Sequence, residues 1–205
     1  MTNGPRHARW VRVTHAIATV SVLALVFSGF VILMAHPRLY WGNAGNDLTK
    51  PLIELPVSRN YKHGGWEGDA RTYDIFNQNG WGRSLHFLAA WLFVIPGLLY
   101  AVFGLSEGHF RTNFWPGGRS HYGATQKHVY TIVVFIFAPL TVASGLGMSP
   151  AITAAWPFLL RVFGGYQTAR TIHFVIFASF VIFVVVHVAM VARSGFVRQT
   201  RGMTW

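Results

Sequence analysis

The segment Arg170–Arg193 reads RTIHFVIFASFVIFVVVHVAMVAR, and its pattern determines the fold class of the chain. The 22 residues between its two arginines are uncharged, enough for a helix to cross the roughly 30 Å hydrocarbon core of a bilayer. Two histidines, His173 and His187, stand 14 positions apart within it. Fourteen steps of about 100° and about 1.5 Å leave them about 40° apart around the helix and about 21 Å apart along its axis. One face of this helix therefore carries an imidazole near each membrane surface.

Three other stretches free of charged residues are also long enough to cross a bilayer. Together the four predicted spans cover residues 13–35, 84–105, 129–148 and 171–192. We find no internal repeat, and the length of 205 residues is that of a single domain, residues 1–205. The sequence predicts an all-α integral membrane protein built as a four-helix transmembrane bundle.

Proline and glycine mark several positions in and between these spans. Pro150 and Pro157 interrupt the uncharged stretch 149–160, which we predict to be an interfacial loop. Pro96 and Pro139 are expected to bend their helices. Four glycines could let a bound group or a neighbouring backbone approach closely: Gly29, Gly97, Gly104 and Gly145.

The composition excludes most classes of soluble protein. Hydrophobic residues make up 52% of the chain and charged residues 11%, whereas a soluble domain carries about 25% charged residues. In so apolar a chain the formal net charge of +11 reflects membrane topology rather than nucleic-acid binding. The chain has no cysteine, which excludes disulfides, thiolate-held iron–sulfur clusters, covalently attached haem and cysteine nucleophiles. Ten histidines are left for redox or metal chemistry.

The distribution of charge predicts the orientation of the bundle. The first span is too long for the core of a signal peptide, and Ala35-His36-Pro37 is a poor cleavage site, so we expect the N-terminus to be retained. With that terminus inside, the inside segments carry nine cations and one anion, and the outside segments eight cations and five anions. Cytoplasmic segments carry the larger excess of Lys and Arg, so both termini are predicted to be cytoplasmic. The long periplasmic loop 36–83 is rich in Gly, Asn, Trp and Tyr, and we expect a docking surface there rather than a solvated connection.

Histidines within the predicted spans fall at two depths. His15 lies at the cytoplasmic end of the first span, at the depth of His187, and His86 lies at the periplasmic end of the second, at the depth of His173. Ionisable groups inside a membrane are costly and usually functional. A single histidine at a helix end is more often an incidental polar residue, but two matched pairs favour ligands. Two facing imidazoles suit the axial positions of a haem iron, whereas zinc needs four ligands.

An arginine stands three positions before three of these histidines. They are Arg12 before His15, Arg83 before His86 and Arg170 before His173. At this spacing the guanidinium lies one turn closer to water on the same helix face and could pair with a haem propionate. The alternative is an arginine that only anchors the helix at the membrane surface.

The remaining histidines are weaker candidates. Five of them lie in predicted tails or loops: His7, His36, His63, His109 and His121. His128 lies at the start of the third helix, directly before the span 129–148 on the cytoplasmic side, and competes with His15. Of these two histidines we prefer His15, because it has the Arg-x-x-His context and His128 does not.

The pattern of histidines resembles the bacterial di-haem cytochrome b-561 family over about residues 6–200. One histidine lies on the first helix, one on the second, none on the third, and His-x13-His on the fourth. Relatives in this family include the membrane cytochrome b subunits of formate dehydrogenase, nickel–iron hydrogenase and thiosulfate reductase. Gly82-Arg83-Ser84-Leu85-His86-Phe87 and the Arg170-x-x-His173 helix look most like the thiosulfate-reductase type. That type is often associated with periplasmic molybdopterin enzymes.

The resemblance implies a multi-pass protein of the bacterial inner membrane that binds two haem b. His15 and His187 would hold the cytoplasmic-side haem, and His86 and His173 the periplasmic-side haem. The protein would be the electron-transfer subunit of a membrane oxidoreductase complex. It would pass electrons between a periplasmic redox partner, such as a molybdopterin oxidoreductase, and the membrane quinone pool. Polar residues that could hold a quinone near the cytoplasmic-side haem, or that are simply interfacial, are Gln126, Lys127, His128 and Tyr130.

Two other functions remain open from the sequence. A stand-alone superoxide:ubiquinone oxidoreductase of the same family also has four helices and two haems, but the modest net charge of the outer segments and the long loop disfavour it. A small membrane transporter or metal carrier could use membrane histidines, but no Asp or Glu lies in the four spans, which counts against proton or cation coupling. The sequence leaves open the partner's substrate, the direction of electron flow, the quinone type and the oligomeric state.

Overall fold

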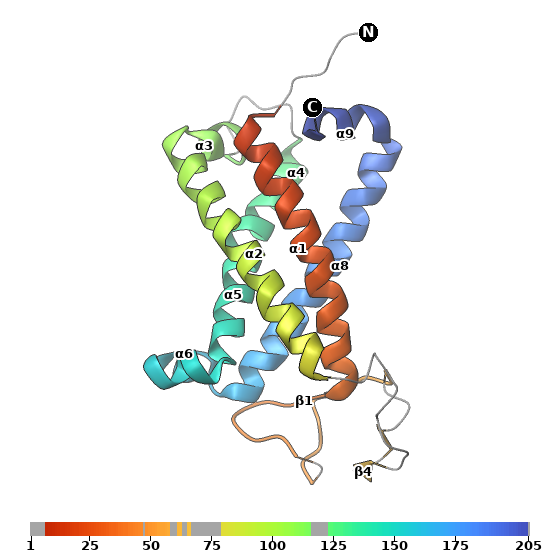
Figure 1. Ribbon diagram of the computed structural model, residues 1–205, viewed down its shortest axis with the longest axis vertical. Coiled ribbons are helices and arrows are strands. Elements are labelled where there is room, and N and C mark those ends of the chain that lie inside the picture. The colour runs from red at the N-terminus through yellow and green to blue at the C-terminus, as the bar shows by residue number, and fades with distance from the viewer. Residues whose placement is uncertain are drawn as a thin grey trace.

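Four long helical segments run side by side along the molecule (Figure 1). The computed structural model describes residues 7–46, 48–57, 61–62, 65–66, 79–115 and 123–204. Three of the segments are single helices, α1 Arg9–Ala35, α2 Asn79–Ser106 and α8 Tyr166–Arg193. The fourth, Ala124–Gly147, contains α4 Ala124–Ile132, the π-helical turn η3 Val133–Phe137 and α5 Ala138–Gly147. All four are long and apolar enough to cross a membrane, so the prediction of an all-α transmembrane bundle is confirmed.

The helices begin four or five residues before the predicted spans. Charge-free stretches set the predicted bounds, but a helix needs no apolar residue once it leaves the hydrocarbon core. Arg9, Arg83 and Arg170 therefore continue the backbone hydrogen bonding into the interfacial layer, where their side chains can reach water.

The π-helical turn η3 lies directly before α5, whose second residue is Pro139. Proline lacks a backbone N–H, and its ring clashes with the carbonyl four residues earlier. A wider turn relieves the clash and keeps the helix continuous. The disturbance expected at Pro139 thus takes the form of a π-helical turn.

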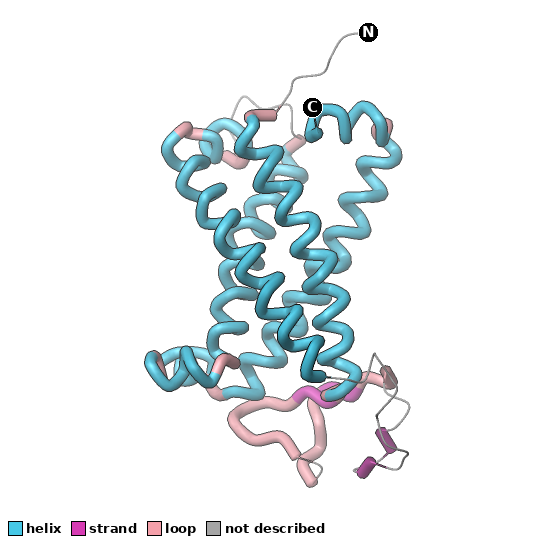
Figure 2. The backbone as a smooth tube through the Cα atoms, in the orientation of Figure 1, coloured by secondary structure: helices cyan, strands magenta, loops and turns pink. Residues whose placement is uncertain are grey.

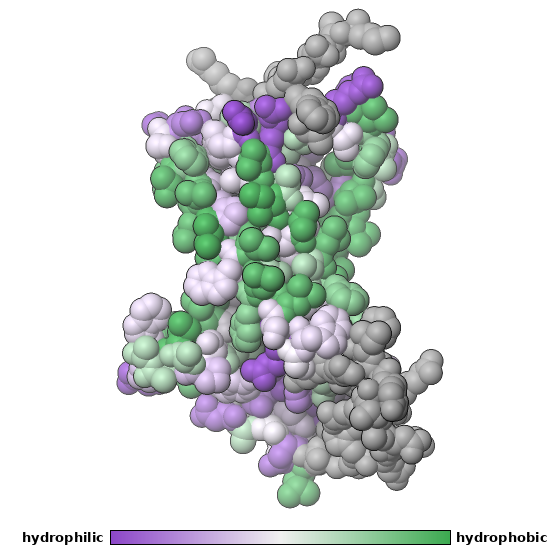
Figure 3. All heavy atoms as spheres, in the orientation of Figure 1, coloured by the Kyte–Doolittle hydropathy of each residue, from purple (hydrophilic) through white to green (hydrophobic). Residues whose placement is uncertain are grey.

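Apolar side chains cover the middle of the bundle, and hydrophilic residues gather at its two ends (Figure 3). Val20, Leu23, Leu98, Val102 and Ile182 each expose more than 60% of their surface. In water this exposure would cost about 25 cal/mol for every Å², whereas in a bilayer the same side chains face lipid. The exposed apolar belt therefore fits a membrane span and not a soluble domain.

Residues 149–160 are largely helical, and the prediction of a loop there was wrong. α6 runs over Pro150–Ala155 and α7 over Phe158–Phe163. Pro150 is the first residue of α6, and Pro157 precedes α7 as its N-cap. At a helix start the missing N–H has no partner to lose, and the fixed φ of proline favours the first turn. These prolines begin helices instead of breaking one.

The segment after α1 forms a short antiparallel ladder below the bundle (Figure 2). β1 Arg38–Leu39 pairs with β2 Ile53–Glu54, and β3 Tyr61–Lys62 pairs with β4 Gly65–Trp66 in a second ladder. Arg38, Leu39 and Tyr40 are buried. Most of the predicted docking loop beyond residue 57, including Arg59, His63 and Arg71, lies outside the described residues.

The N-terminus of α8 is tied to this outer segment. Gly42 O accepts the backbone N–H groups of Gln167 at 2.9 Å and of Thr168 at 3.2 Å, so two donors of the first helical turn are satisfied. In return Gly42 N donates to Thr168 Oγ1 at 2.7 Å. Gly165, the N-cap of α8, has φ 124°, and a Cβ on it would collide with the carbonyl group of Gly42. Only glycine allows this close crossing.

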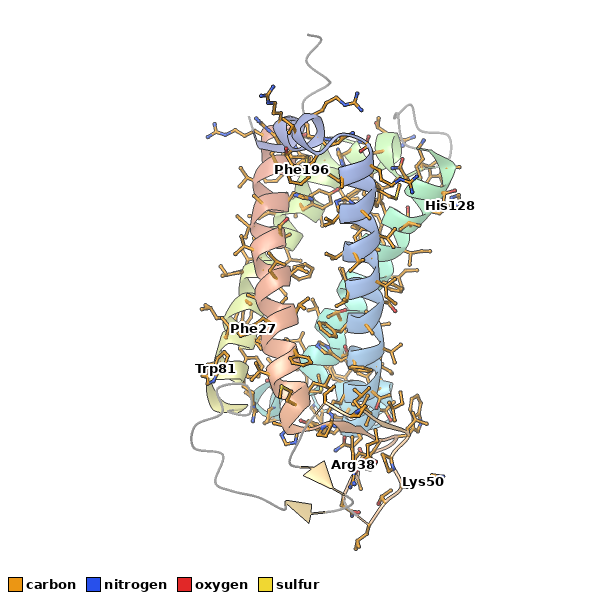
Figure 4. The ribbon with its side chains drawn as sticks, turned by 90° about the vertical axis from the view of Figure 1, so that its right-hand side faces the viewer. Phe27, Arg38, Lys50, Trp81, His128 and Phe196 are labelled. Atoms are coloured by element: carbon orange, nitrogen blue, oxygen red, sulfur yellow. The ribbon has the colours of Figure 1, made fainter. Side chains whose placement is uncertain are left out.

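Helices α3 His109–Asn113 and α9 Phe196–Thr204 lie at the end of the bundle where α1 begins (Figure 1). The start of α1 and the C-terminal helix therefore share one end, as four spans require. Figure 4 labels Phe196 and His128 at this end and Arg38 and Lys50 at the other. That this end is cytoplasmic stays a prediction from the charge distribution. Arg6, Arg119 and His121, which the sequence assigns to the predicted cytoplasmic segments, lie outside the described residues.

The bundle packs as two helix pairs, α1 with α2 and α5 with α8. Small residues allow the close approach within each pair. A Cβ on Gly82 of α2 would lie 2.8 Å from Val31 Cγ1 of α1, which is too close for any real side chain. Ser28 and Ser144 are fully buried, on α1 and α5 respectively. Such close packing of small residues is the common way in which membrane helices associate.

Candidate functional site

α8 carries two histidines, and each of them faces a histidine of another helix. Near the outer segment, His173 lies beside His86 of α2, with ring centroids 6.2 Å apart and ring planes inclined by 63°. Toward the other end, His187 lies beside His15 of α1, with ring centroids 6.4 Å apart and planes inclined by 53°. The structure thus brings together the two pairs that were inferred from depth alone. We refer to them as the outer pair and the inner pair.

The spacing of both pairs fits one metal ion between the two rings. A bond from metal to histidine nitrogen is about 2.0–2.1 Å long, and that nitrogen lies about 1.1 Å from the centre of its ring. Two imidazoles on opposite sides of one ion therefore have centroids about 6.2–6.4 Å apart. The observed values of 6.2 and 6.4 Å lie in this range. Two rings joined by a direct hydrogen bond would lie closer together.

Two histidines at each site suit a metal whose other ligands come from a cofactor. Within the described ranges, no group of three or more His, Cys, Asp or Glu side chains is placed to hold a metal ion. Zinc and calcium sites need more protein ligands than two. Haem iron needs only two axial ligands, because the porphyrin supplies the other four.

Each histidine of the outer pair has a buried serine at its Nδ1 atom. His86 Nδ1 lies 3.0 Å from Ser28 Oγ, and His173 Nδ1 lies 3.0 Å from Ser144 Oγ. His173 Nδ1 is also 3.1 Å from Thr141 O. Both rings are therefore held through Nδ1, which leaves Nε2 as the nitrogen available to a metal.

The glycine that follows each serine lies against the imidazole. A Cβ on Gly29 would lie 3.6 Å from His86 Cε1, and a Cβ on Gly145 would lie 3.4 Å from His173 Cε1. These two glycines were expected to allow a close approach of a bound group or a neighbouring backbone, and the group that the structure places beside them is the histidine ring. Gly97, by contrast, has no other group within 4 Å of the position that a Cβ would take.

Aromatic rings pack against His187 of the inner pair. Phe183 stacks on His187 at a centroid distance of 5.6 Å with an angle of 22° between the planes. The Tyr130 ring lies 6.4 Å from the His187 ring and meets it edge-on. In the described part of the chain, no hydrogen-bond partner is found for the rings of His15 and His187. The inner pair thus differs from the outer pair in what holds its imidazoles.

Two of the arginines with a predicted propionate role lie in different environments. Arg83 is exposed. Arg12 is partly buried, and among the described residues its Nε has no hydrogen-bond acceptor. A buried N–H without an acceptor is costly, and an acidic group bound beside α1 would supply one. The propionate role of Arg12 and Arg83 stays a prediction.

The third arginine, Arg170, is engaged by the outer segment. Its guanidinium donates to Gln167 Oε1 at 3.1 Å, to His36 O at 3.2 Å and to Arg38 O. These bonds hold the segment after α1 against the start of α8. The structure therefore supplies a role for Arg170 without a propionate, and the predicted pairing with haem stays untested.

The other described histidines belong to neither of the two pairs. His128 is exposed on α4 (Figure 4), where its Nδ1 donates to Ala124 O at 2.7 Å. His36 lies at the end of α1 and is exposed. His63 lies outside the described residues. It is His15, and not His128, that the structure places beside His187.

An aromatic cluster anchors the start of the helix that carries His15. Trp10 Nε1 donates to Glu107 Oε2 at 2.8 Å, and the Trp10 ring meets the edge of His109 at 5.1 Å. Burial lowers the pKa of His109, the nearby His7 lowers it further, and Glu107 raises it. The cluster joins α1, the end of α2 and α3, and so fixes the position of α1 at this end.

Comparison with known proteins agrees with this architecture. The family described as prokaryotic cytochrome b561 matches residues 6–205. The chain belongs to this family. It is therefore a haem-binding electron-transfer protein that crosses the bacterial inner membrane several times. The closer likeness to the thiosulfate-reductase type stays a prediction.

One curated relative covers almost the whole chain. YedZ1 of Azospira oryzae, named as a proposed protein-methionine-sulfoxide reductase subunit, is 30% identical over 206 residues. The match covers 91% of this chain and 89% of that relative. No solved structure matches the chain.

Sequence reasoning missed the two serines of the outer pair. Both stand in a Val-x-Ser-Gly motif, at Val26–Gly29 of α1 and Val142–Gly145 of α5. The motif is visible in the sequence, and it occurs in α1 and α5, which pack against the helices of His86 and His173. Val, Ser and Gly are common in membrane helices, so the motif by itself does not indicate a functional site.

Proposed function

We propose that this protein is a di-haem b-type cytochrome that passes electrons between a periplasmic redox partner and the membrane quinone pool. In this proposal His86 and His173 hold the outer haem, and His15 and His187 hold the inner haem. The observation that carries the proposal is the spacing of the two histidine pairs, each of which leaves room for one metal ion between its rings. Bound haem b supplies one-electron chemistry.

In this proposal the protein holds the two sites at fixed depths. His173 and His187 share α8, so about 21 Å of helix axis separates them. Phe183 covers one face of His187, and Ser28 and Ser144 close the backs of the outer imidazoles. One site thus serves each surface of the membrane, as transfer across the bilayer requires.

The outer segment is the proposed docking surface for the redox partner. Trp41, Leu48 and Leu52 expose 66%, 97% and 59% of their surfaces, although they lie beyond the end of the apolar spans. Exposed apolar side chains outside the membrane favour burial against another protein. The name of YedZ1, a proposed reductase subunit, supports a catalytic partner, for which we propose a molybdopterin oxidoreductase.

Tyr130 is the best supported of the four residues considered for quinone binding. Its ring lies 6.4 Å from the ring of the inner ligand His187. The side chain of Gln126 accepts the backbone N–H of Gly123 at 3.2 Å, and His128 bonds its own helix. Both side chains are therefore already hydrogen-bonded at the start of α4 and are weaker candidates for binding a quinone. Lys127 is buried in the same turn, so it remains a second candidate.

Quinol oxidation tests the quinone half of this proposal. Purified protein in lipid nanodiscs is mixed with a soluble quinol, and haem reduction is followed by absorbance. We expect rapid reduction, slowed about tenfold in Tyr130→Phe by loss of one hydrogen bond of about 1–1.5 kcal/mol. Tyr166→Phe, at the far end of α8, is the matched control and should leave the rate unchanged. Haem that no quinol reduces would overturn this half.

Mild-detergent purification from the source membrane tests the partner half. A co-purifying protein that contains molybdenum supports the proposed partner. A chain that purifies alone and reduces ubiquinone with superoxide as the electron donor would instead support a stand-alone superoxide:ubiquinone oxidoreductase.

A further inference from the structure

Ser28 and Ser144 occupy equivalent places beside the two histidines of the outer pair. Each serine oxygen lies 3.0 Å from Nδ1 of its histidine, Ser28 from His86 and Ser144 from His173. Each serine is fully buried. Each also lies on the helix that packs against the helix of its histidine, α1 against α2 and α5 against α8. The two contacts are therefore built the same way in both halves of the bundle.

The proton of each serine hydroxyl is committed to the serine's own helix. Ser28 Oγ lies 2.6 Å from Ala24 O, and Ser144 Oγ lies 2.7 Å from Leu140 O. A carbonyl oxygen can only accept a hydrogen bond, and a hydroxyl has one proton to donate. Donation to the carbonyl four residues earlier is a common arrangement of serine in helices. Toward the histidine, both serine oxygens are left as acceptors.

It follows that both imidazoles donate from Nδ1. At His173 a second contact leads to the same assignment, because Nδ1 also lies 3.1 Å from the carbonyl oxygen of Thr141. A neutral imidazole has a single N–H, so Nε2 of each ring keeps its lone pair. This is the tautomer in which Nε2 can bind a metal. The serines thus select the ligand form of both histidines.

The inner pair has no equivalent contact in the part of the chain that the structure describes. His187 packs on the rings of Phe183 and Tyr130, and among the described residues neither His15 nor His187 has a hydrogen bond from its ring. The two pairs therefore have nearly equal spacing but different hydrogen bonding. A ligand imidazole that donates its N–H is a more basic ligand and stabilises the oxidised, more positive form of the metal.

We propose that Ser28 and Ser144 are positioning residues of the outer haem and that they hold its midpoint potential below the value it would have without them. This inference rests on the proposed function, since it takes His86 and His173 as haem ligands. It also predicts an order of effects. His173 keeps Thr141 O as an acceptor when Ser144 is removed, whereas Ser28 is the partner found for the His86 ring among the described residues. Loss of Ser28 should therefore have the larger effect.

Potentiometric titration of the full-length protein in detergent tests the proposal. The variants are Ser28→Ala and Ser144→Ala, and the outer haem is identified as the component missing from His173→Ala. We expect the potential of the outer haem to rise in both variants, more in Ser28→Ala, while that of the inner haem stays unchanged. Ser21→Ala is the matched control, because Ser21 is buried on α1 and donates to Ile17 O at 2.8 Å without touching either pair.

The outcomes separate this inference from the proposed function. Wild-type protein without haem overturns the proposed function. Two haems with unmoved potentials in both serine variants overturn the inference alone, and so does an equal rise in Ser21→Ala. Loss of only the outer haem in Ser28→Ala supports the positioning role. If Ser28→Ala does not fold, the sign of the shift in Ser144→Ala decides.

Discussion

The rings of His86 and His173 lie 6.2 Å apart, centroid to centroid, although they come from the second and the fourth transmembrane segment. Their partners on the inner side, His15 and His187, lie 6.4 Å apart. α8 contributes one ring to each pair, so it links the two sites, while α1 and α2 each complete one of them. Loss of a single histidine should therefore affect one site and spare the other.

Replacement of His173 by alanine should remove the outer haem, and His187→Ala should remove the inner haem. The physical reason is that, in the proposed function, each pair would supply both axial ligands of one iron, and one remaining imidazole would hold haem weakly. The haem content of each purified variant, measured as pyridine haemochrome, should fall to about half. His128→Ala is the control, because His128 belongs to neither pair and donates to Ala124 O of its own helix, and its haem content should stay at the wild-type value. Two haems retained in His173→Ala would show that the pairing is wrong.

Gly145→Leu should impair the outer site, because a Cβ at this position already lies 3.4 Å from His173 Cε1. The rest of a leucine side chain would push the imidazole away at a cost of about 1–3 kcal/mol, which corresponds to a loss in haem affinity of roughly 5- to 150-fold. Haem titration of the apoprotein measures this loss. Gly97→Leu changes the same residue type where nothing lies within 4 Å, and it should bind haem normally. Equal affinities in the two variants would contradict the close contact.

Arg170→Ala should loosen the outer segment. The variant loses the bonds from the guanidinium to His36 O and Arg38 O, and hydrogen bonds to charged groups contribute about 1.5–3 kcal/mol each. Amide hydrogen exchange of residues 36–42 should then be at least about 10-fold faster, as measured by mass spectrometry. Arg83→Ala, also three residues before a histidine but exposed, should leave the exchange of this segment unchanged. An unchanged exchange rate in Arg170→Ala would show that the guanidinium does not hold the outer segment against α8.

The orientation of the bundle can be tested with single cysteines, because the natural chain has none. Leu48→Cys lies on the outer segment, where Leu48 is 97% exposed, and Ser194→Cys lies just after α8 at the opposite end. In intact spheroplasts, a membrane-impermeant maleimide should label Leu48→Cys and leave Ser194→Cys unlabelled until the membrane is opened. The reverse pattern would place the termini outside.

Much of the fold follows from the sequence, because a bilayer imposes simple rules on composition. Charge-free stretches of about 20 residues predicted all four spans, and one helical repeat argument placed His173 and His187 on one face. Because neighbouring spans run antiparallel, His15 then falls at the depth of His187, and His86 falls at the depth of His173. The length, charge and helical geometry of a span are determined by residues close together in the chain, so they can be read from the sequence.

The features that the sequence did not reveal depend on how helices rotate and pack. The contact of Ser28 with His86 requires a particular rotation of α1 against α2, which no local pattern specifies. The role of Pro150 depends on whether proline begins or interrupts a helix. The bonds of Arg170 require the outer segment to fold back onto α8. In each case the deciding interaction joins residues that are distant in sequence or depends on tertiary packing.

The most direct test of the central claim is the haem stoichiometry of the purified full-length protein, combined with its reduced-minus-oxidised absorption spectrum. Two matched histidine pairs predict two haem b per chain, both with the spectrum of low-spin iron bound by two imidazoles. A preparation that is folded and helical but binds one haem or none would contradict the account.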